Sequence, residues 1–445
     1  MDETPKNLWE DTDKSKYQLH VTIPTIDSTI ESENVDERVV YIGDLEKRKQ
    51  VYGICGECKE PGTGIKWCQS CNAKRSKDNF KNWTSGNKDI DEFIQQSQLN
   101  AVYCKKYLEW IPFEKIQNIT YIAEGGFDFL NEIKSHLQIH LVDIIQCFGI
   151  TQDPNSKEYM MVIEYCNNGN LRNYLNKSEN YIDYKFKIDK LQQIARGLLD
   201  IHNAEKVHKD FHSGNILFKY GPYISDLGMC QPANIKQTVK EEGICGVLPY
   251  MAPEVLRGQQ YTKAADIYSF GIIMNEFLSE EIPFNDIPHN EFLAIKICKG
   301  LRPTISNDIP KLLADLIIKC WDAEMKNRPT TKELYQTLNG WSSGQNSEIY
   351  FQIEECDKIR KEKFKNRSNE DKSKSFKTHP QAIYTSRLLN FNSLPKPVNS
   401  SFQFSSDTNY TAQSTSVNPI SECLDVQLSE LELNEICQDG EDNIE

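Results

Sequence analysis

The sequence has no long apolar run and no surplus of positive charge. None of its apolar stretches approaches the roughly 20 residues that a membrane-spanning helix needs, and the first residues, Met1 to Glu10, are acidic and polar. The formal net charge is −14, from 65 acidic and 51 basic side chains, which disfavours nucleic acid or an anionic membrane surface as the main partner. We therefore expect a cytoplasmic protein without a secretory signal and without membrane insertion.

Without a secretory signal, the 14 cysteines are expected to be reduced. Four of them form a pattern: Cys55 and Cys58 make one pair, Cys68 and Cys71 make another, and nine residues lie between the pairs. Two such pairs at this distance are typical of a structural Zn²⁺ site with four thiolate ligands and no open position. A redox pair and plain buried thiols are the alternatives.

Composition divides the chain into five parts, and we found no internal repeat. The predicted parts are a flexible acidic leader (1–50), a zinc-ribbon-like module (51–75), a linker with a short helix near Ile90 to Leu99 (76–112), a large domain of alternating strand-like and helix-like segments (113–340), and a charged helix followed by a disordered acidic tail (341–445). The linker helix either docks on the next domain or belongs to its core.

The most specific pattern is the run from His208 to Asn215, followed by Asp226, Leu227 and Gly228. These residues and spacings resemble the catalytic and metal-binding loops of the eukaryotic protein kinases. The resemblance implies that Asp210 orients the attacking hydroxyl and that Asn215 and Asp226 hold Mg²⁺ or Mn²⁺ against the phosphates of ATP. Both are hard oxygen ligands of the kind that Mg²⁺ prefers.

Three further residues extend the resemblance through the large lobe. Glu254 ends a Met-Ala-Pro-Glu run, and Arg328 before Pro329 is its matching partner in a buried structural ion pair. Asp266 resembles the helix aspartate that supports the backbone of the catalytic loop. Together with Cys320 and Trp321, these features are most similar to the tyrosine-kinase-like group.

The adenine site is placed by the same resemblance. Ile163 matches the gatekeeper, Glu164 and Cys166 offer main-chain groups at the hinge, and Leu217 lies beneath the adenine ring, although a plain core role for Leu217 is equally consistent. Ala123, Gly125 and Gly126 resemble the start of the glycine loop over the phosphates. Asp128 falls where the third glycine is expected.

The small lobe lacks the segment that should carry the ATP-binding lysine. Glu132 matches the glutamate that pairs with this lysine, but only seven positions separate it from Gly125. Strands two and three of the kinase sheet, with strand lengths of roughly 5 to 6 residues each, cannot fit near residues 127–129. We hypothesise that an exon of roughly 30 residues, the length of two strands and their connections, is missing from the coding sequence.

The resemblance implies an α+β, two-lobed kinase fold, with a truncated β-sheet N-lobe and a mainly helical C-lobe, beside the small zinc module. We expect a protein kinase of the Ser/Thr type, although His212, Gly214 and Val247 match neither the Ser/Thr nor the Tyr pattern. Thr238 is a candidate activating phosphosite or a plain loop threonine. The alternatives are a catalytically inactive pseudokinase scaffold and a protein whose working part is the zinc module. Protein substrates are the expected partners, with signalling partners bound through the module and the tails.

Overall fold

The computed structural model describes residues 21–23, 39–117, 129–139, 143–178, 181–233, 243–366, 378–391 and 393–399, all within the compact unit Met1–Ser401. Most of the predicted leader, the glycine loop with Ala123, Gly125 and Gly126, the candidate phosphosite Thr238 and the acidic end fall outside these residues. None of the helices in the described part is long and apolar enough to cross a membrane.

The packed structure begins earlier than we predicted. Strand β1 (Val21–Ile23) pairs in parallel with β2 (Val39–Tyr41), and helix α2 (Leu45–Tyr52) follows after Asp44, whose side chain accepts the Lys47 amide at 2.9 Å. Arg48 on α2 donates to Ile42 O at 2.7 Å, Pro61 O at 2.5 Å and Gly62 O at 3.0 Å. Because this guanidinium ties α2 to the cysteine loop, residues 39–50 belong to the module and not to a flexible leader.

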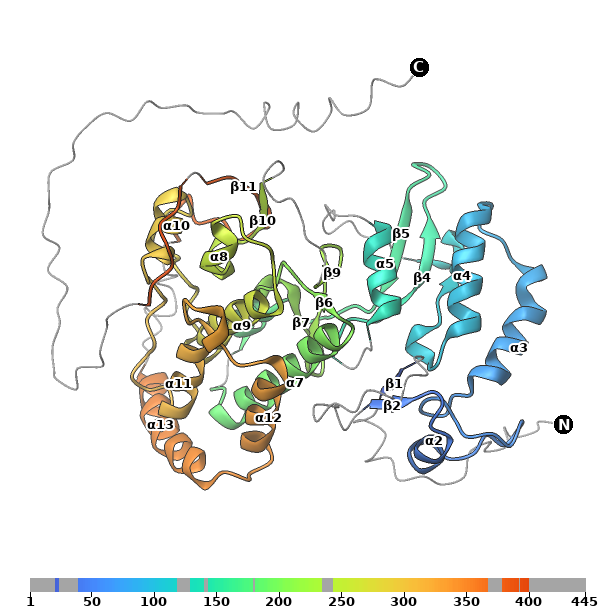
Figure 1. Cartoon of the computed structure of the whole chain (residues 1–445), viewed down its shortest axis with the longest axis horizontal. Helices are drawn as coiled ribbons and strands as arrows, with labels where there is room; N and C mark the ends of the chain where they lie inside the picture. Colours follow the sequence, from blue (N-terminus) through green and yellow to red (C-terminus); the bar gives the residue numbers. More distant parts are fainter. Residues whose placement is uncertain are drawn as a thin grey trace, which may run out of the picture. The chain divides into compact units, whose positions relative to one another are not determined.

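The predicted linker helix is present and belongs to the core of the small lobe. Helix α3 (Gln69–Asn79) leads to α4 (Lys88–Asn100), which begins at the capping residue Asn87. Ile90 and Ile94 of α4 pack in one buried apolar cluster with residues of the sheet and of helix α5 (Phe129–Gln138), namely Leu108, Ile133, Cys147 and Ile150. Residues 88–110 therefore complete the small lobe (Figure 1).

The small-lobe sheet has three strands in the order β3 (Glu109–Trp110), β4 (Cys147–Gln152) and β5 (Tyr159–Ile163). β3 runs parallel to β4 so closely that a Cβ at Gly149 would lie 1.9 Å from Glu109 O, which explains the glycine. β5 is antiparallel to β4 and has no neighbour on its other side within the described residues. On β5, Met160 and Ile163 are 37% and 43% exposed, as apolar side chains at an unpaired sheet edge of the described residues.

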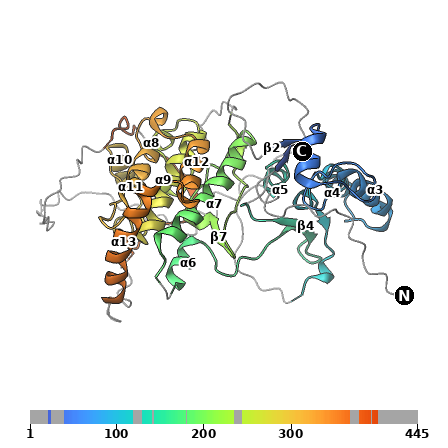
Figure 2. The same cartoon turned by 90° about the horizontal axis from the view of Figure 1, so that it is seen from below.

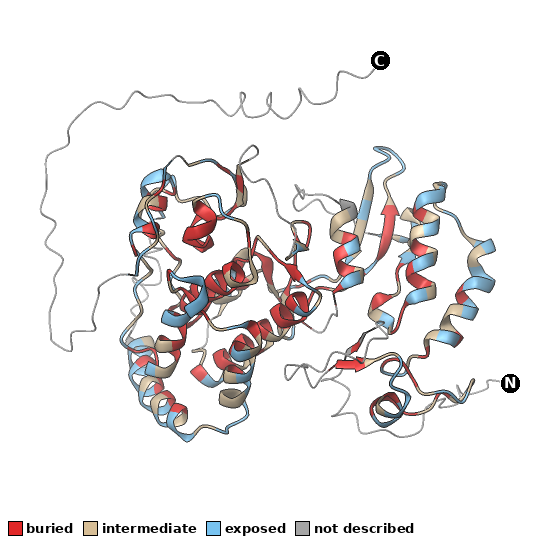
Figure 3. Cartoon of the chain, viewed as in Figure 1, coloured by how far each residue is buried: buried red, intermediate tan, exposed pale blue. Residues whose placement is uncertain are grey.

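The large lobe is mainly helical and is built around two buried helices, α7 (Tyr184–Asn203) and α9 (Lys263–Ser279), as Figure 3 shows. α12 (Thr331–Ser342) packs against α7, and α11 (Lys311–Cys320) against α9 (Figures 1 and 2). The other elements of this lobe are α6 (Leu171–Lys177), β6 (Lys206–Val207), β7 (Ile216–Phe218), β8 (Pro222–Ile224), β9 (Gln231–Pro232), β10 (Ile244–Gly246), α8 (Pro253–Leu256), α10 (Glu291–Cys298), α13 (Ser347–Asn366) and β11 (Arg387–Leu389). The predicted α+β fold with a sheet-containing small lobe and a helical large lobe is confirmed.

The chain beyond residue 340 contains the predicted charged helix, but part of the stretch that we predicted to be a disordered tail packs on the large lobe. Helix α13 matches the predicted charged helix, but its Ile349 and Ile353 are buried in the large-lobe core. The tail segment, which we define as residues 378–399 without residue 392, lies against the same lobe. In it, β11 pairs with β10 in antiparallel register, and Leu389 and Leu394 are buried. Burial of these two leucines offsets part of the entropy cost of ordering the segment.

Candidate functional site

Asp210 lies in the loop between β6 and β7, and its backbone is held in an unusual conformation. The preceding residue, Lys209, has φ = +70°, a value that non-glycine residues seldom adopt and that is often found at functional sites. Asn215 ends the loop, and its Nδ2 donates to Asp210 O at 3.0 Å. Since the amide nitrogen is engaged there, the amide oxygen of Asn215 points the other way and is available for a cation.

Asp266 of α9 supports this loop from below, as we predicted. Its carboxylate accepts the backbone amides of His208 at 2.8 Å and Lys209 at 3.2 Å. His202 Nε2 lies 2.9 Å from Asp266 Oδ2, and the His202 Nδ1 contacts the Thr331 hydroxyl. Two backbone hydrogen bonds to one buried carboxylate fix the backbone conformation of the loop just before Asp210.

Asp226 follows β8, and the structure brings it to the same place. Its φ is +57°, again in the left-handed region. The residue before it, Ser225, donates from its amide and its hydroxyl to Asn215 O at 2.9 and 3.1 Å, which joins the two loops. Burial raises the pKa of Asp226, and the nearby Asp210 raises it further against the lowering effect of His208. A carboxylate destabilised in this way gains from a bound cation.

The Asp210 carboxylate has two different environments. Oδ1 is buried without a hydrogen-bond partner among the described residues, whereas Oδ2 accepts a hydrogen bond from the Ser386 hydroxyl and lies 3.5 Å from His212 Nε2. Burial raises the pKa of Asp210, but His212, the Ser386 hydroxyl and His208 lower it more, so the net shift is downward. Asp210 is therefore ionised at neutral pH and able to accept a hydrogen bond from a hydroxyl.

The predicted adenine side is only partly described. On the hinge, Glu164 donates its backbone N–H to Gln146 O at 2.8 Å, which leaves its carbonyl as the group to meet a ligand, and its side chain pairs with Lys219. Cys166 is 7% exposed and receives the Gly169 amide on its carbonyl. Leu217 is the half-buried residue of β7, between the buried Ile216 and Phe218, as a residue beneath a ligand should be. Ile163, the predicted gatekeeper, is 43% exposed at the open sheet edge.

Helix α5 is docked on the Asp226 loop. Asn131 Nδ2 donates to Gly228 O at 2.6 Å and to Cys230 O at 3.2 Å. Burial, and next the negative charge of Asp226, raise the pKa of Glu132 to about 7, although the Leu227 amide opposes the shift. No cationic side chain is among these groups in the described part of the chain. Glu132 matches the glutamate that pairs with the ATP-binding lysine, and among the described residues no cation shifts its pKa.

The predicted ion pair between Glu254 and Arg328 is confirmed. Arg328 donates two bonds to the Glu254 carboxylate, at 2.7 and 2.8 Å, and both side chains are buried. The same guanidinium donates to Asp322 O and Ala264 O. The pair closes α8 against the end of the large lobe and does not reach Asp210 in any described contact.

The four cysteines of the N-terminal module form one cluster. Their sulfur atoms all lie within 4.8 Å of one another, with Cys55 to Cys71 at 3.9 Å and Cys58 to Cys68 at 3.5 Å. A tetrahedral zinc ion with bonds of about 2.3 Å requires sulfur separations of about 3.8 Å, so the donor set fits. The pKa shifts within the cluster differ in direction: burial raises the pKa of Cys55, but hydrogen bonds, first from the amides of Cys58 and Glu57, lower it more, whereas burial raises the pKa of Cys68 and Cys71. A bound cation would favour the thiolate form of all four.

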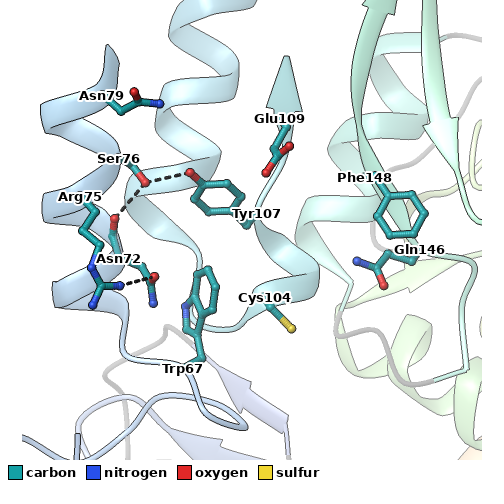
Figure 4. A pocket seen from close by; sticks show the side chains of 10 residues that line it. All are labelled: Trp67, Asn72, Arg75, Ser76, Asn79, Cys104, Tyr107, Glu109, Gln146 and Phe148. Carbon is teal, nitrogen blue, oxygen red and sulfur yellow. Dashed lines mark hydrogen bonds between the residues drawn. The ribbon is translucent and has the colours of Figure 1, made fainter. Parts of the chain in front are cut away.

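A pocket of about 620 Å³ lies between α3 and the small-lobe sheet (Figure 4). Its wall includes Arg75 and Ser76 of α3, Tyr107, and Phe148 of β4. The Ser76 hydroxyl is 3.0 Å from the Tyr107 hydroxyl, and Arg75 donates to Asn72, so these polar groups already have partners. The pocket lies where the module meets the small lobe, and none of the predicted site residues lines it.

Sequence reasoning missed a polar network beside the catalytic loop. Arg172 of α6 donates to Glu276 at 3.2 Å, Ser213 at 3.3 Å and the Tyr250 hydroxyl at 2.9 Å. Tyr250 donates in turn to Glu276 at 2.6 Å. These residues come from four distant parts of the chain, so no spacing could reveal them. Ser386 was missed for the same reason.

Comparison with known proteins gives one family and several relatives. A family model described as protein tyrosine and serine/threonine kinase matches residues 114–338. The serine/threonine-protein kinase VIK of Arabidopsis thaliana is 31% identical over 222 residues, which are 47% of this chain and 50% of VIK. The kinase/receptor R831 of Acanthamoeba polyphaga mimivirus is 36% identical over 182 residues, 40% of this chain and 11% of R831. The RGS domain-containing serine/threonine-protein kinase A of Dictyostelium discoideum is 29% identical over 207 residues, 45% of this chain and 18% of that protein. The chain thus spans half or less of the length of these relatives.

Proposed function

Because the chain belongs to the protein tyrosine and serine/threonine kinase family, we propose that it transfers the γ-phosphoryl group of ATP to serine or threonine hydroxyls of protein substrates. The names of the relatives, all serine/threonine kinases, support this choice of hydroxyl. Cys320 and Trp321 ahead of Arg328 support a place near the tyrosine-kinase-like group. A role in signalling is part of the same proposal.

The observation that carries the proposal is the convergence of Asp210, Asn215 and Asp226. Asp210 is ionised and has one unpartnered buried oxygen, while the Asn215 amide oxygen and the Asp226 carboxylate are two hard donors held beside it. Mg²⁺ bound with ATP would neutralise the charge that develops on the phosphates. In this scheme Asn215 and Asp226 hold the cation, and Asp210 orients the substrate hydroxyl and receives its proton.

Phosphate transfer by the purified full chain tests the proposal. We expect radiolabel from Mg-ATP on a mixed generic substrate such as casein, and loss of this label in Asp210→Asn. Asp315→Asn is the matched control, because Asp315 lies on the exposed face of α11 and only pairs with Lys311. Equal labelling by wild type and Asp210→Asn, or no labelling by wild type, would refute the proposal.

Glu132 favours a second candidate, the inactive scaffold. The pKa of this glutamate beside Asp226 is about 7, and no cation of the described residues is among the groups that shift it, whereas an active small lobe pairs it with a lysine. The discriminating result is a chain that binds protein partners but transfers no phosphate and shows no thermal shift with Mg-ATP.

We also propose that Cys55, Cys58, Cys68 and Cys71 hold one structural Zn²⁺. The sulfur separations and the amides aimed at Cys55 support it. The metal would fold a module whose own apolar core is small, and this module is a candidate surface for signalling partners.

A further inference from the structure

The tail segment approaches the catalytic loop from the large lobe and is anchored along its length. Near its start, the His379 amide donates to Asn285 O at 2.7 Å, and Gln381 O accepts the His289 amide at 2.9 Å. Near its end, the Val398 amide donates to Cys298 O at 3.0 Å. Between these anchors the segment passes next to Asp210, with Ser386 in contact with it.

At the crossing, Ser386 donates its hydroxyl to Asp210 Oδ2. This is the contact that a kinase catalytic aspartate makes with the hydroxyl it activates, in both geometry and chemistry. Ser386 is only half-buried, so the contact is not forced by packing of the serine in a core.

The chain on both sides of Ser386 is bound in the manner of a peptide substrate. After Ser386, β11 pairs with β10, which lies between Asp226 and Glu254 in the sequence, with Arg387 opposite Gly246 and Leu389 opposite Ile244. Backbone pairing of this kind binds an extended peptide with little regard to its side chains. The register therefore places Ser386 just before the paired strand.

Before Ser386, Tyr384 provides the side-chain anchor. Its ring lies 4.1 Å under the Arg172 guanidinium and 4.7 Å from the His289 ring in an edge arrangement, and its hydroxyl donates to Pro283 O at 2.8 Å. Three separate contacts on one aromatic side chain make it the main specificity element in the segment. The polar network around Arg172 holds its guanidinium in place against the Tyr384 ring.

We propose that Ser386 is phosphorylated in cis by the site that it occupies, and that the site takes extended peptides with an aromatic residue two positions before the acceptor. This inference rests on the proposed kinase function. The Ser386 oxygen would form a bond to the γ-phosphorus of ATP while the bond from that phosphorus to the β–γ bridging oxygen breaks. ADP leaves, and the hydroxyl proton passes to Asp210 Oδ2. Tethering replaces a bimolecular encounter by a positioned one.

A cross-link tests the position of the segment without ATP. Leu388 lies directly opposite Cys245, and opposed residues of an antiparallel pair project to the same face at a separation that a disulfide can span. We expect Leu388→Cys in the full chain, treated with a mild copper-phenanthroline oxidant, to form a disulfide with Cys245. Digestion without reduction should then yield the peptide of residue 388 linked to the peptide of Cys245. Asn390→Cys, one residue beyond β11 and exposed, is the matched control and should yield little of it. Equal yields from the two variants would overturn the inference.

Phosphate mapping tests the reaction. With Mg-ATP we expect label on the peptide containing Ser386, and the fraction of chains labelled per unit time should not depend on protein concentration. The label should be lost in Ser386→Ala and Asp210→Asn and retained in Ser343→Ala, which changes an exposed serine outside the segment. Label on Thr385 in place of Ser386, or a labelled fraction per unit time that rises with protein concentration, would overturn the inference. A generic substrate in the same reaction separates the two failures: if casein is labelled and Ser386 is not, only this inference fails. If neither is labelled, the proposed function fails and takes this inference with it.

Discussion

Arg328→Met should destabilise the large lobe more than any change at an exposed ion pair. The Arg328 side chain is 0% exposed and makes four hydrogen bonds, two to Glu254 and one each to Asp322 O and Ala264 O. Its loss leaves the Glu254 carboxylate, 4% exposed, without the cation that compensates for its burial. Breaking a buried pair from one side costs about 3–5 kcal/mol in the free energy of unfolding.

Glu254→Gln should cost less, about 1–3 kcal/mol, because Arg328 keeps its two carbonyl partners and the new amide oxygen still accepts one N–H. At about 2–4 °C per kcal/mol for a domain of this size, the melting temperature should fall by about 6–20 °C for Arg328→Met and by about 2–12 °C for Glu254→Gln. The two variants differ in cost because Arg328 keeps two carbonyl partners in Glu254→Gln, whereas Glu254 loses its cation in Arg328→Met.

Thermal and urea unfolding of the full chain would measure both variants and the double variant. The double variant strands no charge, so we expect it to be more stable than the sum of the single effects predicts. Lys311→Met breaks the exposed pair with Asp315 and should change the stability by less than about 0.5 kcal/mol. A cost below about 1 kcal/mol for Arg328→Met, or strict additivity in the cycle, would refute this reasoning.

Three further changes have defined outcomes. Glu132 has a folded pKa of about 7 against an ordinary value of 4.5, so its ionisation in the folded state lowers the stability as the pH rises through this range. In magnesium-free buffer, Glu132→Gln should raise the free energy of unfolding by about 2–3 kcal/mol at pH 8 and leave it unchanged at pH 4, as measured by urea unfolding. Cys58→Ser should remove the bound zinc, measured by atomic emission, whereas Cys104→Ser, at an exposed cysteine outside the cluster, should retain it. Asp266→Asn should lower kcat with little change in KM, since Asp266 fixes the loop backbone and contacts no substrate.

Each of these has a contrary result. A Glu132→Gln gain that does not depend on pH would mean that the carboxylate is not the source of the cost. Equal zinc content in the two cysteine variants would separate the cluster from the metal. An unchanged kcat in Asp266→Asn would show that the catalytic loop holds its shape without that carboxylate.

Local motifs in the sequence were enough to predict the contacts of the large-lobe machinery. Asp210 and Asn215 are close in the sequence, and their spacing carries the resemblance to protein kinases, whereas the pairing of Glu254 with Arg328 was implied by that resemblance and not by spacing. The charge pattern likewise predicted the charged helix that the structure shows as α13. These features depend on residues near one another or on patterns shared across a family.

Features that depend on long-range packing could not be predicted in the same way. Leu389 and Leu394 lie in a short stretch with Leu388 and Phe391, too short for its apolar residues to define a helical or a strand period, yet both are buried against the large lobe. Arg48 was an ordinary basic residue until the structure showed its three carbonyl partners. In each case the partner is fixed only by the tertiary fold.

The contacts of the small lobe bear on where this protein can be cut. The family match begins at residue 114, but the Lys106 amine, which is buried, donates to Leu137 O and Ile139 O at the end of α5. A fragment of residues 114–338 would leave these carbonyls without their donor and would uncover the faces of Ile133 and Ile150 that α4 covers. A fragment that keeps these contacts must therefore begin before α4, and it must extend through the tail segment to keep Leu389 and Leu394 in the large-lobe core, so the unit of folding is larger than the matched residues 114–338.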